Sequence, residues 1–189
     1  MEPKIVLINP FIGPSPLLIP LGLFSIYSSL KEKNIHPVET DISTPMLAAK
    51  AYEQQLRDQF KLNPGDFPTF DFILLGVGED GHTASLFPRH KEATELERLA
   101  VAVTGPDIKI PRVSLSLATI NHARHIFVLA TGENKAEILR KIFIGKEVLP
   151  ISLIHPPEGT LVYLLDKDAA AGLPKDDFSH FEDAIVMNL

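Results

Sequence analysis

The chain has 189 residues and a net charge of −6, which excludes a broad basic surface for nucleic acid or an anionic membrane. Its length suits one well-buried domain, and its 45% hydrophobic and 22% charged residues are typical of a globular protein. It contains no cysteine, which excludes disulfides, iron–sulfur clusters and thiolate zinc sites. We therefore expect a single cytoplasmic domain, residues 1–189, that uses no metal and no cofactor.

One segment raises the question of a membrane. Residues 5–30 carry no charged side chain, and this run is long enough to cross a bilayer. Four prolines interrupt it, whereas a signal peptide needs a basic start and an unbroken apolar centre. The prolines are Pro10, Pro14, Pro16 and Pro20. We interpret the segment as a strand, a proline-rich loop and a short helix, and we expect no membrane partner.

Predicted strands and helices alternate along the chain. Strands are indicated by short aliphatic and β-branched runs, of which residues 70–76 (FDFILLG) form the clearest. Helices are indicated by apolar residues at helical spacing, as in residues 135–143. The predicted strands are residues 4–9, 35–41, 70–76, 100–104, 112–117, 125–130 and 160–165. The predicted helices are residues 21–33, 44–60, 83–86, 92–99, 119–124, 135–143 and 168–173.

This alternation predicts an α/β fold. A mainly parallel sheet covered by helices on both faces gives three layers in a Rossmann-like arrangement. Thr44 is expected to cap the helix that follows it, and Pro45 suits the first helical turn. Residues 174–189 are expected to form a mobile tail or a packing arm.

A glycine-rich turn follows the clearest strand. Residues 76–81 (GVGEDG) match the pattern G-x-G-x-x-G, which in isolation suggests a dinucleotide site. In such sites the acidic residue ends the next strand. Here the candidate, Glu97, lies in a segment with a helical pattern, and the turn lies in the middle of the chain. We therefore disfavour nucleotide binding.

The same turn favours another chemistry. Its glycines let backbone N–H groups approach a ligand at the carboxyl end of a strand, where open α/β sheets bind ligands. A histidine there can take a proton from water, and a carboxylate can fix its tautomer. Asp80 and His82 are the candidates. The three residues D-G-H alone leave an alternative open, in which Asp80 caps a helix and His82 is a surface residue. The glycines concerned are Gly76, Gly78 and Gly81.

Four segments together resemble one known family. Residues 74–88 (LLGVGEDGHTASLFP) resemble the signature of the 6-phosphogluconolactonase family, which is related to the glucosamine-6-phosphate deaminases. Residues 111–117 resemble its R-[VI]-T-L-T strand, and residues 131–136 resemble its G-x-x-K-A turn. Residues 163–170 resemble its W-x-x-D-x-x-A-A pattern, with tyrosine in place of tryptophan. The resemblance covers roughly residues 35–173.

The resemblance implies a function. The chain would hydrolyse 6-phospho-D-glucono-1,5-lactone to 6-phosphogluconate, a step of the pentose phosphate pathway. His82 would activate water, and Asp80 would orient the His82 ring. Arg112 and Lys135 would contact the phosphate. The glycine turn would supply N–H donors for the oxyanion. The deaminase relatives carry a glutamate where this chain has Phe87, which favours hydrolysis over isomerising deamination.

The first 34 residues do not resemble the family. Neither its glycine- and serine-rich phosphate loop nor its D-E-R segment is found, so we expect a fold shortened relative to the family. Residues 3–33 instead resemble the opening of cobalamin-binding domains on radical enzymes. No D-x-H-x-x-G motif accompanies them, so we infer no cofactor. The alternative functions are a catalytically weak or inactive phosphosugar-binding domain and a cobalamin-associated module. His90, beside Arg89 and Lys91, is expected in a solvated loop, with a contribution of positive charge at the rim of the cleft as the alternative.

Overall fold

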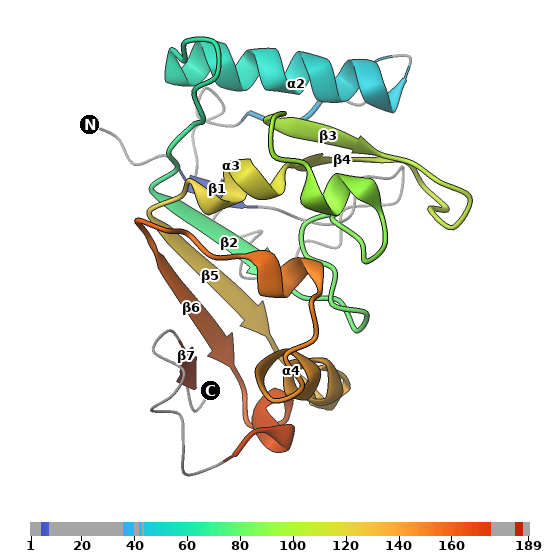
Figure 1. Ribbon diagram of the computed structural model, residues 1–189, viewed down its shortest axis with the longest axis vertical. Helices are drawn as coiled ribbons and strands as arrows, with labels where there is room; N and C mark the ends of the chain where they lie inside the picture. The colour runs from blue at the N-terminus through green and yellow to red at the C-terminus, as the bar shows by residue number, and fades with distance from the viewer. Residues whose placement is uncertain (1–4, 8–35, 40–41, 43, 175–183, 187–189) are drawn as a thin grey trace.

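Five parallel strands form the central sheet of the computed structural model, which describes residues 5–7, 36–39, 42, 44–174 and 184–186 (Figure 1). Their spatial order is β1-β2-β5-β6-β7, and every pair of neighbours is parallel. The middle strands are hydrophobic runs buried in the core, as expected for a parallel sheet. The bounds are β1 Ile5–Leu7, β2 Phe72–Gly76, β5 His125–Ala130, β6 Thr160–Leu165 and β7 Ala184–Val186.

The strand register places three carboxyl ends beside one another. Gly76 at the end of β2 pairs with Leu129, and Ala130 at the end of β5 pairs with Leu165 at the end of β6. The segments that follow β2, β5 and β6 therefore leave the sheet side by side, at the carboxyl ends of the strands, which we call the carboxyl edge. This is the edge where ligands bind in open α/β sheets.

A two-stranded antiparallel ribbon forms a second sheet beneath the helix α2. The ribbon consists of β3 (Ala100–Val103) and β4 (Arg112–Leu115), and α2 (Pro45–Phe60) packs against both strands (Figure 1). Both strands were predicted, but neither joins the parallel sheet. The connection between them is too short for the crossover that parallel strands require, so the chain turns back as a hairpin.

The predicted start of α2 is confirmed. Thr44 is extended, and its hydroxyl oxygen accepts a hydrogen bond from the Leu47 N–H at 3.2 Å, while Pro45 occupies the first turn. The helix ends where Lys61 adopts a left-handed conformation with φ of 54°.

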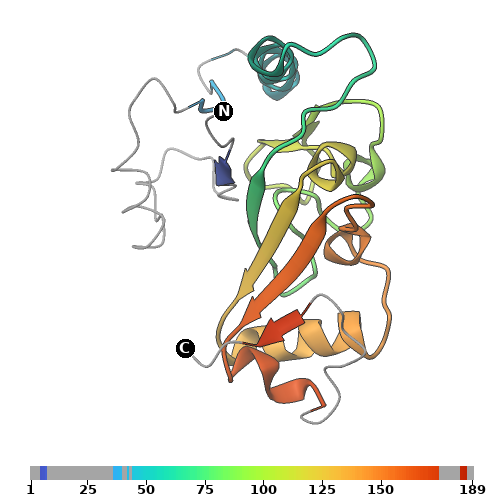
Figure 2. The same cartoon turned by 90° about the vertical axis from the view of Figure 1, so that its left-hand side faces the viewer.

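Shorter helices complete the described core. They are α3 (Leu117–Asn121) and α4 (Ala136–Phe143), with the 3-10 turns η2 (Lys91–Thr94), η3 (Glu133–Lys135), η4 (Pro150–Leu153) and η5 (Ala169–Gly172). In Figure 2, α3 (yellow) and α4 (orange) lie on one side of the sheet. The large side chains that are buried in this core include Ile73, Leu75, Ile120, Ile126, Val128, Leu139, Ile151 and Leu165. The predicted class, a mainly parallel sheet with helices, is thus confirmed.

Two helix predictions are wrong. Residues 83–86 form a tight turn instead, because the Leu86 N–H donates to the Thr83 carbonyl at 2.8 Å and Ala84 has φ of 51°. Of the helix predicted for residues 92–99, only residues 92–94 are helical, as part of the 3-10 turn η2. The Glu95 carboxylate accepts hydrogen bonds from the backbone N–H groups of Glu97 and Arg98. These bonds offer the backbone an alternative to the hydrogen bonds of a helix.

The two ends of the chain also differ in part from expectation. The first predicted strand is present as β1, which pairs with β2 at the edge of the sheet. Within residues 36–39 there is no strand, and the predicted helix 21–33 lies outside the described residues. The region expected to be a mobile tail or a packing arm contributes the strand β7, which was not predicted and which extends the sheet beyond β6. No helix among the described residues is long and apolar enough to span a membrane.

Candidate active site

The glycine turn after β2, residues 76–81, is closed by its own backbone. The Gly78 N–H donates to the His82 carbonyl at 2.8 Å, and the Gly81 N–H donates to the Gly78 carbonyl at 3.0 Å. Gly81 has φ of 82°, a conformation that side chains disfavour. Because these two N–H groups are already bound to backbone carbonyls, they shape the turn and do not fit the expected role of oxyanion donors.

Asp80 and His82 form a pair on this turn. His82 Nδ1 lies 2.6 Å from Asp80 Oδ1, and the His82 backbone N–H donates to the same oxygen at 3.1 Å. Burial raises the pKa of Asp80, but its hydrogen bonds and charge interaction with His82 outweigh burial, so the pKa lies below its ordinary value. An ionised Asp80 assigns the proton of a neutral His82 ring to Nδ1. The other nitrogen, Nε2, is then free to accept a proton.

Gly78 makes room for this pair. A Cβ atom there would lie 2.1 Å from His82 Nδ1 and 2.6 Å from Asp80 Oδ1, which no packing allows. At Gly76, by contrast, an added Cβ would meet no atom within 4 Å. The glycines of the pattern therefore have different roles, and Gly78 is the one that the side-chain pair requires.

The segment after His82 is tied to the sheet and to the ribbon. The Thr83 hydroxyl donates to the Gly76 carbonyl at 2.8 Å, and the Ser85 N–H donates to the Ser114 hydroxyl on β4 at 3.2 Å. All four side chains of residues 83–86 are buried. These contacts fix the path of the chain from His82 to Phe87.

Phe87 lies between two of the predicted site residues. Its ring centroid is 4.6 Å from that of His82, with 37° between the ring planes. The Arg112 guanidinium carbon lies 5.8 Å from the same centroid, within the range of a cation–π contact. The position at which the deaminase relatives carry a glutamate is thus occupied by an apolar ring that contacts both His82 and Arg112.

The His90 side chain lies beside Phe87 and is largely buried, contrary to the expectation of a solvated loop. Its side chain is only 13% exposed, its Nε2 lies 3.0 Å from Asp107 Oδ2, and its ring is 6.0 Å from that of Phe87. The hydrogen bond with His90 lowers the pKa of Asp107. No local sequence pattern identifies this pair, because its two members are separated by η2 and β3.

Lys135 lies on the turn after β5, next to the glycine turn. The Asn134 side-chain amide donates to Glu79 Oε1 at 2.7 Å, which connects the two turns. The Lys135 side chain is half-buried, and no described residue forms a hydrogen bond or ion pair with its ammonium group. The structure thus brings Asp80, His82 and Arg112 together around Phe87, whereas it shows no direct contact between Lys135 and His82.

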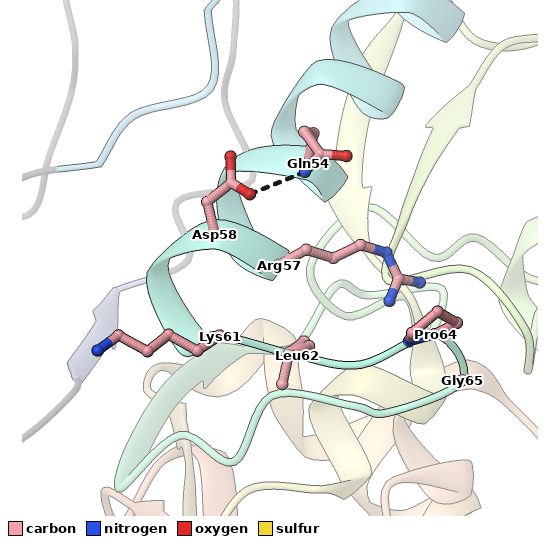
Figure 3. A pocket seen from close by; sticks show the side chains of 7 residues that line it. All are labelled: Gln54, Arg57, Asp58, Lys61, Leu62, Pro64 and Gly65. Atoms are coloured by element: carbon pink, nitrogen blue, oxygen red, sulfur yellow. Dashed lines mark hydrogen bonds between the residues drawn. The ribbon is translucent and has the colours of Figure 1, made fainter.

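A hollow elsewhere on the surface contains none of these residues. It lies at the carboxyl end of α2 and is drawn in Figure 3. Arg57 on its wall forms an ion pair with Glu53 at 3.1 Å, and Glu53 also pairs with Arg98 at 2.8 Å. The lining residues are Gln54, Arg57, Asp58, Lys61, Leu62, Pro64 and Gly65. Within the described ranges, no group of three or more histidine and acidic side chains is arranged to hold a metal.

The parallel α/β sheet carries a histidine–aspartate pair on the glycine turn at the carboxyl ends of its strands. The sequence pattern described as Glucosamine-6-phosphate isomerases/6-phosphogluconolactonase matches residues 22–163, and the chain belongs to this family. The match begins before residue 35 and ends before residue 173, the limits expected from the sequence.

Individual relatives agree with this family. The chain is 40% identical to a 6-phosphogluconolactonase of Synechocystis sp. over 147 residues, which cover 76% of this chain and 60% of that protein. It is 43% identical to a 6-phosphogluconolactonase of Bos taurus over 127 residues, or 65% of this chain and 48% of that protein. The solved 6-phosphogluconolactonase of Trypanosoma brucei matches with a TM-score of 0.62 and 32% identity, over 75% of this chain and 59% of that one. The chain thus spans about half to three fifths of the length of these relatives.

Replacing Gly78 with alanine tests the packing of the pair. We expect Gly78→Ala to lower the free energy of unfolding by about 1–3 kcal/mol, the usual cost of overpacking, and to separate His82 from Asp80. Gly76→Ala is the matched control, and its effect is expected within about 0.5 kcal/mol. Urea denaturation and the NMR signals of the His82 ring measure the two effects. Equal losses in both variants would contradict this role of Gly78.

Proposed function

We propose that the chain hydrolyses 6-phospho-D-glucono-1,5-lactone to 6-phosphogluconate. The observation that carries this proposal is the 2.6 Å contact between Asp80 and His82 at the carboxyl edge of the sheet. The names of the relatives support it, since the Synechocystis and Bos taurus proteins are 6-phosphogluconolactonases. The reaction belongs to the pentose phosphate pathway, and we place it in the cytoplasm because a chain without cysteine suits a reducing compartment.

In the proposed mechanism His82 acts as a general base. Its Nε2 takes a proton from a water molecule while the water oxygen attacks the lactone carbonyl carbon. The ionised Asp80 stabilises the imidazolium that results. Collapse of the tetrahedral intermediate breaks the bond between the carbonyl carbon and the ring oxygen, and the imidazolium returns its proton to that oxygen. Because a lactone is an activated ester, a neutral imidazole is a sufficient base.

Arg112 and Lys135 are the proposed contacts for the substrate phosphate. The chain has a net charge of −6, so an anionic substrate must be held by a few local cations. A guanidinium group binds phosphate oxygens in pairs, and Arg112 is held beside His82 by the ring of Phe87. Lys135 precedes α4 at its amino end, where a cation is unfavourable unless an anion is bound nearby.

Phosphosugar binding without efficient turnover is the second candidate. It is favoured by the internal hydrogen bonds of the Gly78 and Gly81 N–H groups, because these two groups are then not available as donors for the oxyanion. The absence of a carboxylate at Phe87 favours either candidate over isomerising deamination. Turnover and binding must therefore be measured separately.

Turnover is tested by replacing the pair. We expect His82→Ala to reduce kcat/KM by about 10²–10⁴-fold, the usual contribution of a general base, and Asp80→Asn to reduce it less. His125→Ala is the control, because His125 is exposed at the amino end of β5, away from the glycine turn. Lactone hydrolysis is followed by acid release after subtraction of the spontaneous rate. Equal rates for the wild type and His82→Ala would contradict the proposed mechanism.

Binding is tested at Arg112. We expect Arg112→Ala to weaken the binding of 6-phosphogluconate about 10–100-fold, as expected for the loss of a hydrogen bond to a charged group. Arg124→Ala is the control, since Arg124 pairs with Asp71 next to the amino end of β5. Isothermal titration calorimetry gives both affinities. If 6-phosphogluconate binds equally well to Arg112→Ala and to the wild type, Arg112 does not contact the phosphate.

A further inference from the structure

The turn that carries Lys135 is fixed from two sides. This turn, residues 132–135, leaves the end of β5, and the order of the sheet places β5 between β2 and β6. The glycine turn therefore lies on one side of it, and the segment after β6 lies on the other. Each neighbour contributes one carboxylate to it, Glu79 from the glycine turn and Asp166 from the end of β6.

Asp166 holds the first residue of the turn. Both of its carboxylate oxygens lie 3.0 Å from the Gly132 nitrogen, and Oδ1 also accepts a hydrogen bond from the Ala169 N–H at 2.8 Å. Gly132 has φ of 90°, a conformation that few residues other than glycine adopt. A half-buried carboxylate thus stabilises a backbone conformation that determines where the turn goes next.

Close packing continues this restraint into α4. A Cβ atom on Gly172 of η5 would lie 3.2 Å from the Ala136 carbonyl oxygen, so η5 lies directly against the start of α4. The Lys135 N–H donates to the Gly132 carbonyl at 3.0 Å. The backbone of Lys135 is therefore held between the residue that Asp166 binds and the helix that η5 supports.

On the opposite side, Asn134 binds Glu79. The Asn134 amide donates to Glu79 Oε1 at 2.7 Å, and both side chains are exposed. Glu79 precedes Asp80, so this bond connects the turn of Lys135 directly to the turn that carries the His82 pair. Neither carboxylate forms an ion pair with Lys135.

We propose that Asp166 and the Glu79–Asn134 pair are positioning residues, which fix the backbone of Lys135 relative to His82 so that one phosphosugar can contact both. This inference rests on the proposed function, and it adds three residues that do not touch the substrate. If these residues had a purely structural role, replacing them would lower the stability of the chain and would affect KM and kcat alike. A positioning role acts through Lys135 and must vanish when the Lys135 side chain is removed.

The test uses the full chain and pairs each substitution with Lys135→Ala. We expect Asn134→Ala to raise KM about three- to tenfold, as for the loss of one hydrogen bond, with kcat within about twofold. Asp166→Asn is expected to act in the same direction. Asp168→Asn is the matched control, because this exposed acid on the same segment has the same charge and makes no side-chain hydrogen bond to the turn. Glu79→Gln keeps an acceptor for Asn134 and should leave KM close to that of the wild type. Glu79→Ala removes the acceptor and should raise KM.

The double variants decide between the two roles. When Lys135 is already alanine, Asn134→Ala and Asp166→Asn should change KM by less than about twofold, since coupled residues are not additive. An undiminished rise in KM in that background, or a fall in kcat at constant KM, would overturn the positioning role while the proposed function stands. If the wild type binds 6-phosphogluconate without turnover, calorimetric affinities replace KM in the same cycles. A wild type that neither binds nor turns over would overturn both proposals.

Discussion

The hydrogen bond between Asp80 and His82 is the contact on which the rest of the site depends. It is short, at 2.6 Å, and it exists only because position 78 has no side chain. The backbone bonds that close the glycine turn place both residues at the end of β2, and Phe87 then packs on the His82 ring. A single missing Cβ atom thus leaves room for the imidazole of His82 and the carboxylate of Asp80 to pair on one turn, with the Phe87 ring packed on the imidazole.

The parallel sheet gives this turn its neighbours. Because β2, β5 and β6 end beside one another, residues far apart in the sequence meet at one edge without any long loop. Glu79, Asn134 and Asp166 cross-link the three strand ends through side-chain hydrogen bonds. Arg112 reaches the site from the antiparallel ribbon, so the two sheets contribute different parts: the ribbon contributes a cation, and the parallel sheet carries the Asp80–His82 pair.

Local patterns in the sequence predict much of this structure. The strand before Gly76 and the helix after Thr44 follow from hydrophobic runs and capping, which are local properties. Residues 83–86 do not, because side-chain bonds to β2 and β4 override their helical pattern. β7 was missed since its pairing depends on the exposed edge of β6. The loss of the second half of the helix predicted for residues 92–99 has a local cause, the Glu95 side chain.

In the site, too, residues that are contiguous in the sequence could be predicted, whereas contacts between distant residues could not. Asp80, His82 and the glycines are contiguous, so their pattern identifies them, and the resemblance to the family adds Arg112 and Lys135. The pairs His90–Asp107 and Gly132–Asp166 are formed by residues that are distant in the sequence. No motif contains the first pair, and although Gly132 and Asp166 lie in two family-like segments, neither segment indicates that they bond to each other. Only the packing of the chain reveals that the first lies against Phe87 and that the second fixes the turn of Lys135.

A crystal structure of the chain with 6-phosphogluconate tests the central claim most directly. The account predicts that the sugar-acid carboxylate lies within hydrogen-bonding distance, about 3 Å, of His82 Nε2, with the phosphate in contact with Arg112 and Lys135. Phosphosugar bound elsewhere, for example beside Arg57 and Lys61 at the end of α2, with no contact to His82, would contradict it.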